Sequence, residues 1–155
     1  MGATQFKIAD VEQSLIAALQ ADAGIQGLKA QVQGLSSKHF DEQGNIIVLP
    51  PAVLVFFEAG KDDGKNDTVR TTYQTDYDFC LFCGAADLTS TDKERTNAYI
   101  LIATVRAAIA GKRLALDGGD NLSGPVGLNG ITWEQADANG AWYCQRISVP
   151  KTAQF

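Results

Sequence analysis

Apolar residues near the N-terminus recur at helical spacing. The stripe consists of Ile8, Val11, Leu15 and Leu19. It predicts a surface helix with one buried face, which Gly24 and Gly27 are expected to end. Two weaker extended segments are predicted next, at residues 27–34 and 45–49.

A second pattern begins after Pro50 and Pro51. The run Ala52–Phe57 is apolar without alternation, as expected for a strand covered on both faces. Apolar and polar residues then alternate through much of Val69–Cys83, which predicts a partner strand. With Ala59–Thr68 as the connecting loop, the two segments predict a long antiparallel hairpin.

A second helix is expected between Thr91 and Gly111. The sequence Thr91-Asp92-Lys93-Glu94 matches a capping box, and Gly111 is a natural stop. The residues between them leave only narrow polar stripes, which is too apolar for a helix with half of its circumference in water. We therefore expect this helix to lie on the sheet and to be covered again on its outer face.

The last third of the chain predicts a loop followed by a hairpin. Asp117–Gly130 is rich in glycine, and loops of this length are often functional. Ile131–Glu134 and Ala141–Val149 flank an Asn-Gly turn signal. Pro150 is expected to close the last strand and to leave a short flexible tail at residues 150–155.

These elements predict one α+β domain spanning residues 1–155. The expected order is α-β-β-β-α-β-β, with two main helices packed on a mostly antiparallel central sheet. The length of 155 residues and the 45% hydrophobic content suit one buried core.

Charge and composition then exclude some classes of function. The formal net charge of −5 argues against a surface that grips nucleic-acid phosphates. The apolar runs fall short of the roughly 18 residues that a membrane-spanning helix needs. The three cysteines, without a secretory signal, are expected to be reduced thiols.

Candidate catalytic motifs fail on inspection. Cys80 and Cys83 are three residues apart on a predicted strand, so they should face opposite sides rather than share a metal or redox site. His39 is the only histidine and is interpreted as a surface residue. Gly60-Lys61 lacks the rest of a phosphate-binding loop. We expect no catalytic residues, no metal and no cofactor.

Two sets of charged residues remain as candidate interaction sites. Asp76 and Asp78 share one face of their predicted strand and should make it acidic and wet. A further set falls on one helical stripe and consists of Arg95, Arg106 and Arg113. A solvated stripe is the preferred interpretation, and one half of a subunit contact is the alternative.

The order of elements resembles a known family. It is carried by an N-terminal amphipathic helix, the strand opening Pro51-Ala52-Val53-Leu54-Val55, and a helix that contains Tyr99-Ile100-Leu101 and ends at Ile109-Ala110-Gly111. The chain resembles the tail-terminator proteins of Mu-like bacteriophages and prophages over roughly residues 6–149. The resemblance lies in apolar positions rather than in a chemical signature.

The resemblance implies a structural protein of the virion tail, assembled in the bacterial cytoplasm. Such a subunit forms a hexameric ring on the last ring of the tail tube, stops tube growth and offers the surface for head-tail joining. Its partners would be further copies of itself, the tail tube protein, and a head-completion or neck protein. DNA would pass through without specific binding, and Asp62, Asp63, Asp76 and Asp78 are candidates to line that channel.

Three alternatives stay open. One is a head-closure or connector adaptor protein of the phage neck, which would share the size and the lack of chemistry. Another is a small thiol enzyme, for which Cys144 is the least implausible nucleophile. The third is a host-directed binding module.

Overall fold

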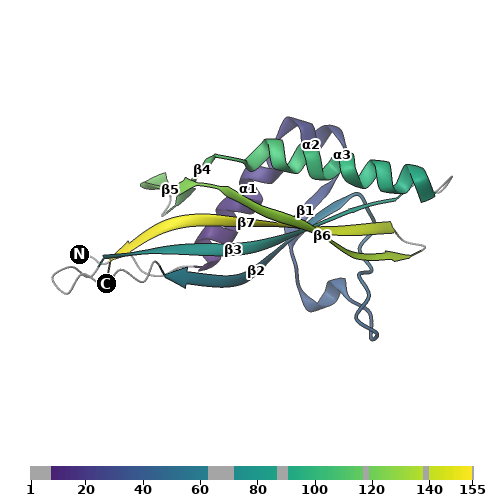
Figure 1. Cartoon of the computed structure of the whole chain (residues 1–155), viewed down its shortest axis with the longest axis horizontal. Coiled ribbons are helices and arrows are strands. Elements are labelled where there is room, and N and C mark those ends of the chain that lie inside the picture. Colours follow the sequence, from purple (N-terminus) through teal and green to yellow (C-terminus); the bar gives the residue numbers. More distant parts are fainter. Residues whose placement is uncertain (1–7, 63–71, 87–90, 117–118, 138–139, 155) are drawn as a thin grey trace.

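The computed structural model describes residues 8–62, 72–86, 91–116, 119–137 and 140–154, some of them at element ends by backbone alone (Figure 1). Its helices are α1 (Ile8–Gln20), α2 (Ala23–Gly27) and α3 (Thr91–Ile109). Its strands are β1 (Gln31–Gly34), β2 (Ala52–Asp62), β3 (Thr72–Ala85), β4 (Arg113–Leu116), β5 (Asn121–Pro125), β6 (Gly127–Asp137) and β7 (Gly140–Gln154). The expected α+β class is therefore confirmed.

Five of the described strands form one sheet in the order β1-β2-β3-β7-β6. β1 runs parallel to β2, and the other neighbours are antiparallel. The β2–β3 and β6–β7 hairpins match the predicted ones. β4 and β5 form a separate antiparallel pair.

α1 and α3 pack on one face of the sheet, which we call the helix face, and α2 packs against these two helices. The stripe on α1 is completely buried at Val11, Leu15 and Leu19, as its spacing predicted. It meets buried side chains of α3 and of the central strands in one continuous cluster. Each such aliphatic side chain stabilises the fold by about 1.5–3 kcal/mol relative to an exposed one.

The opposite face, the open face, is covered at one end only. The 3-10 helix Ser37–His39 and the segment up to residue 48 fold beneath the sheet (Figure 1). There they bury a second cluster, which consists of Ile46, Ala52, Leu54 and Trp142. The prediction that β2 is covered on both faces is thus correct at the start of the strand. The cover of its open face ends at Phe56, which is 43% exposed.

His39 belongs to this covering segment, and its interpretation as a surface residue was wrong. Its side chain is only 4% exposed. Nδ1 accepts a hydrogen bond from the backbone N–H of Ser36 at 2.8 Å, which closes the turn before the 3-10 helix. The ring is buried because the whole segment folds back onto the sheet.

Two predicted boundaries near the N-terminus were also wrong. α1 ends at Gln20, and Gly24 and Gly27 lie in α2, whose first turn is capped by Asp22 through a 3.0 Å bond from the N–H of Ile25. Residues 45–49 form no strand and contribute only a bridge between Phe40 and Ile46.

The glycine-rich segment at residues 117–130 is not a plain loop. In the part that the structure describes, it contains β5 and the start of β6. A Cβ added to Gly124 would lie 2.9 Å from the side chain of Pro150, so the glycine lets β5 approach β7 closely. Gly124 thus serves packing, whereas Gly119 and Gly130 adopt positive φ angles of 97° and 115°.

Pro150 does not close the last strand, because β7 continues to Gln154. β6 pairs with β7 only from the Gly127–Ser148 pair onward. β6 is not paired with residue 150, so β7 needs no backbone N–H for β6 at this position. A proline, which lacks that N–H, is tolerated at such an unpaired position. β2 likewise extends to Asp62, four residues into the predicted loop.

Candidate interaction surfaces

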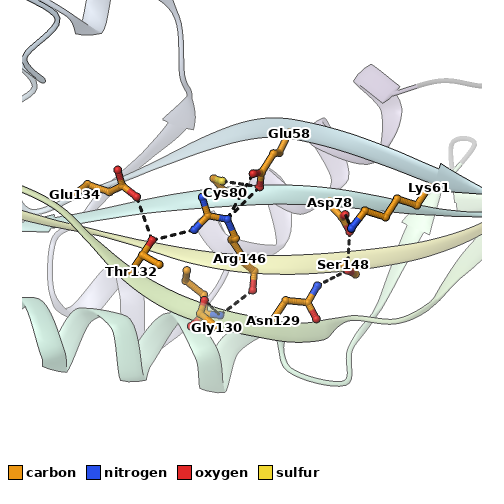
Figure 2. A network of polar contacts seen from close by, with 11 residues as sticks. Glu58, Lys61, Asp78, Cys80, Asn129, Gly130, Thr132, Glu134, Arg146 and Ser148 are labelled. Carbon is orange, nitrogen blue, oxygen red and sulfur yellow. Dashed lines mark hydrogen bonds and ion pairs between the residues drawn. The ribbon is translucent and has the colours of Figure 1, made fainter.

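The uncovered part of the open face carries a polar network drawn in Figure 2. Its side chains come from β2, β3, β6 and β7, and they are Glu58, Lys61, Asp78, Cys80, Asn129, Thr132, Glu134, Arg146 and Ser148. A shallow hollow of about 600 Å³ lies among several of them. β3 and β7 are direct neighbours, so register brings residues far apart in sequence together.

Arg146 organises one half of this network. Its Nε lies 3.3 Å from a carboxylate oxygen of Glu58. Its Nη1 donates to the hydroxyl of Thr132 at 2.9 Å, and that hydroxyl donates to Glu134 at 3.0 Å (Figure 2). Glu58 stands at a bulge in β2, which breaks the alternation of its strand.

Asp78 organises the other half. Its carboxylate lies 3.3 Å from Nζ of Lys61 and accepts a 2.7 Å hydrogen bond from Ser148. Asn129 donates to the same serine hydroxyl (Figure 2). The Asp78 side chain is 15% exposed, whereas Lys61 is 74% exposed.

The predicted acidic, wet face is therefore corrected in part. Asp78 is compensated by Lys61 and mostly buried, and Asp76 is partly buried. The backbone of Asp62 ends β2, but its side chain and the whole of Asp63 lie outside the described residues. The role of these four carboxylates as a channel lining therefore stays a prediction.

The cysteines face apart as predicted. Cys83 is buried on the helix face, while Cys80 lies on the open face and donates to Glu58 at 3.0 Å. The hydrogen bond with Cys144, burial and the Glu58 carboxylate all raise the pKa of the Cys80 thiol. Cys144 is completely buried, so this candidate nucleophile offers no access to a substrate.

The predicted arginine stripe does not extend over all three residues. α3 ends at Ile109, and Gly111 turns the chain with a positive φ of 72°. Arg113 therefore lies on β4, where it donates to the carbonyl of Ser123 at 3.4 Å. Arg95 lies in α3, but its side chain is outside the described part.

Arg106 is held against the sheet. Its Nη1 donates to Oε1 of Gln145, a fully buried side chain on β7, at 2.9 Å. The amide nitrogen of Gln145 donates in turn to the carbonyl of Gly130 on β6 at 3.1 Å. Gln145 thus joins α3, β6 and β7.

A second hollow, which we call the apolar hollow, lies between α3 and the edge strand β6. Its volume is about 400 Å³, and it is lined by Tyr99, Ile102, Ala103, Arg106, Ile131 and Tyr143. Tyr99 and Ile131 are 53% and 43% exposed, and the neighbouring Trp133 is 61% exposed. Within the described residues, the expectation that α3 is covered again is thus not met beside the hollow.

Arg146 and Gln145 were missed because their partners lie on other elements, and Trp133 was missed because its exposure depends on the fold. The signal was present in the alternation of β7, where Cys144, Arg146 and Ser148 share one face. Only the register shows that this face meets Glu58 and Asp78.

Within the described residues, no group of three or more histidine, cysteine, aspartate or glutamate side chains is arranged to hold a metal ion. None of the described helices is long and apolar enough to cross a membrane.

The comparisons with known proteins give a likeness of fold. The sequence matches no family model, and no curated protein sequence matches it significantly. A chain in the solved virion of a native gene transfer agent particle has a similar structure, with a TM-score of 0.57 and 14% sequence identity. The match covers 96% of this chain and 100% of that one.

Proposed function

We propose that this chain is a tail-terminator subunit that forms a ring of six on the head-proximal end of a phage tail tube. The ring stops tube growth and provides the surface to which the filled head attaches. The observation that carries the proposal is the fold likeness to a gene transfer agent virion chain over nearly the whole length of both chains. The family resemblance of the apolar pattern supports the more specific role.

The surfaces support assembly with proteins. A 19-residue helix leaves aromatic and aliphatic side chains exposed beside an edge strand, which is a typical feature of protein interfaces. The charged side chains of the open face are largely paired with one another. With a formal net charge of −5 in each copy, a ring would let DNA pass without the grip of a cationic surface.

The proposal is tested by disabling the gene for this chain in the phage or prophage that encodes it. Tail length and head attachment are then measured by negative-stain electron microscopy. We expect tubes of uncontrolled length without heads, and expression of the wild-type chain from a plasmid should restore uniform, joined tails.

Two other outcomes would contradict the proposal. Tails of normal length that lack heads would favour the head-closure or connector role instead. Normal tails with attached heads would exclude both roles.

A further inference from the structure

Exposed apolar side chains gather on two different faces of the chain. One group is the apolar hollow, on the helix face between α3 and β6. The other is at Ile47 and Leu49, which are 49% and 75% exposed and end the segment that covers the open face. Figure 1 shows α3 and this covering segment on opposite sides of the sheet.

The hollow has a rigid base and an apolar rim. Tyr99 and Tyr143 meet edge to face with ring centroids 5.7 Å apart. Arg106 is fixed at the base by Gln145, so its charge does not swing freely across the opening. Ala103 is an exposed small residue in the lining of the hollow, so it leaves space into which a side chain can enter.

The two edges of the sheet differ in how they are protected. At the β1 edge, the side chain of Gln20 donates to the carbonyl of Val32 at 3.0 Å and so blocks an outward backbone group. β6, the other edge, is an 11-residue strand beside the hollow. A neighbour can therefore approach the hollow from the β6 side and cover backbone and side chains together.

We propose that the hollow receives Leu49 and Ile47 of a second copy of this chain. The inference rests on the proposed ring, because a ring closes through a heterologous contact between two different surfaces of each subunit. An exposed apolar projection on one face and an apolar hollow on the other meet that requirement. The formal charges also differ in sign, since Lys38, Asp41 and Glu42 give the covering segment, residues 37–48, a net negative charge, whereas the charged residue that lines the hollow is Arg106.

The test uses two variants that each block one side of the contact. Ala103→Glu places a charged side chain in the hollow and leaves the projection intact. Leu49→Asp removes the apolar projection and leaves the hollow intact. Each variant alone should be monomeric by light scattering under conditions in which the wild-type chain assembles.

Mixing the two variants gives the decisive result. The Leu49→Asp variant keeps an intact hollow, and the Ala103→Glu variant keeps an intact projection, so these two surfaces can still bind each other. An equimolar mixture should therefore form heterodimers and no larger particles, because the other two surfaces of each pair are blocked. A mixture that stays monomeric, or a Leu49→Asp variant that assembles like the wild type, would overturn the contact.

Ala17→Glu is the matched control, because Ala17 is an exposed alanine on α1, away from the hollow. It should assemble like the wild type, and thermal unfolding should show that all three variants fold. If the Ala103→Glu and Leu49→Asp variants each still form a ring of the wild-type size, this contact is refuted and the ring itself is not. A wild-type chain that stays monomeric up to millimolar concentration would contradict the ring and the contact together.

Discussion

Trp142 fills the covered end of the open face because the residue opposite it is a glycine. In the register of β3 and β7 it pairs with Gly84, and a Cβ on Gly84 would lie 2.5 Å from its indole ring. The indole is completely buried and forms the floor on which Ile46 and Leu54 pack. The covering segment, and with it the position of Leu49, depends on this one missing methyl group.

Gly84→Ala should therefore destabilise the protein. The methyl group must displace the Trp142 ring, and overpacking of this kind costs about 1–3 kcal/mol. Gly27→Ala is the control, since its added Cβ meets nothing within 4 Å. Its effect should stay within about 1 kcal/mol and favour the helix. Urea unfolding measures both, and equal stability of Gly84→Ala and the wild type would show that the ring is not packed there.

Asp41 stabilises the turn of the same covering segment. Its Oδ1 accepts hydrogen bonds from the backbone N–H groups of Asn45 at 2.8 Å and Gln43 at 2.9 Å. The backbone bond from Asn45 is the largest cause that lowers the pKa of Asp41. Because the folded pKa is below the unfolded one, the stabilisation is present at neutral pH and is lost as the pH falls through the folded pKa.

The prediction is that Asp41→Asn weakens the pH dependence of stability below about pH 4, near which an unfolded aspartate titrates. The free energy of unfolding should fall less steeply with acid in the variant than in the wild type. Glu42→Gln, which removes the neighbouring carboxylate, is the control. If the free energy of unfolding falls with acid identically in Asp41→Asn and the wild type, the Asp41 carboxylate does not stabilise the turn.

At the scale of elements, a polar contact attaches α3 to the sheet in addition to its apolar stripe. Gln145 accepts from Arg106 on α3 and donates to Gly130 on β6, although it is fully buried on β7. A buried amide is stable only when its partners are in place. This contact therefore sets the distance between α3 and β6, and so the width of the apolar hollow.

Gln145→Ala should remove the hydrogen bonds to Arg106 and Gly130 and leave a cavity in place of a fully buried side chain, which should lower the free energy of unfolding by about 1–3 kcal/mol. It should also weaken self-assembly, because the base of the hollow is lost. Gln13→Ala, which removes an exposed glutamine from α1, should change stability by less than about 0.5 kcal/mol. Chemical unfolding and light scattering would measure the two effects, and an unchanged Gln145→Ala variant would contradict them.

The elements that could be predicted from sequence are those with strong local patterns. The stripe of α1 and the β2–β3 hairpin follow from the spacing of apolar residues, the length of α3 from its capping box and Gly111, and the β6–β7 hairpin from its Asn-Gly turn. The strands at residues 117–130 and the passage of β7 through Pro150 could not be predicted, because they depend on which strand lies alongside. The glycine and proline content of these segments indicated turns, but packing against neighbouring strands makes them extended.

The candidate sites divide in the same way. Asp78 and Arg106 stood out by their positions, but their partners Lys61 and Gln145 are set by register and helix docking. The burial of His39 likewise depends on a segment folding back over the sheet. The sequence shows which side chains are able to form ion pairs or hydrogen bonds, but the fold determines which of them come within contact distance.

At the scale of the whole molecule, the chain has the properties of a subunit that is completed by its neighbours. Its helix face leaves an apolar hollow, its open face ends in an apolar projection, and a long edge strand lies beside the hollow. A head-to-tail arrangement would cover all three features at once. The proposed terminator ring explains them with one contact repeated around the axis.

The most direct test of this account is cryo-electron microscopy of purified tails without imposed symmetry. The account predicts six copies of the chain in one closed ring at the head-proximal end of the tube, with Leu49 of each copy in the hollow of the next. Copies at another position on the particle, or tails that contain no copy of the chain, would contradict it.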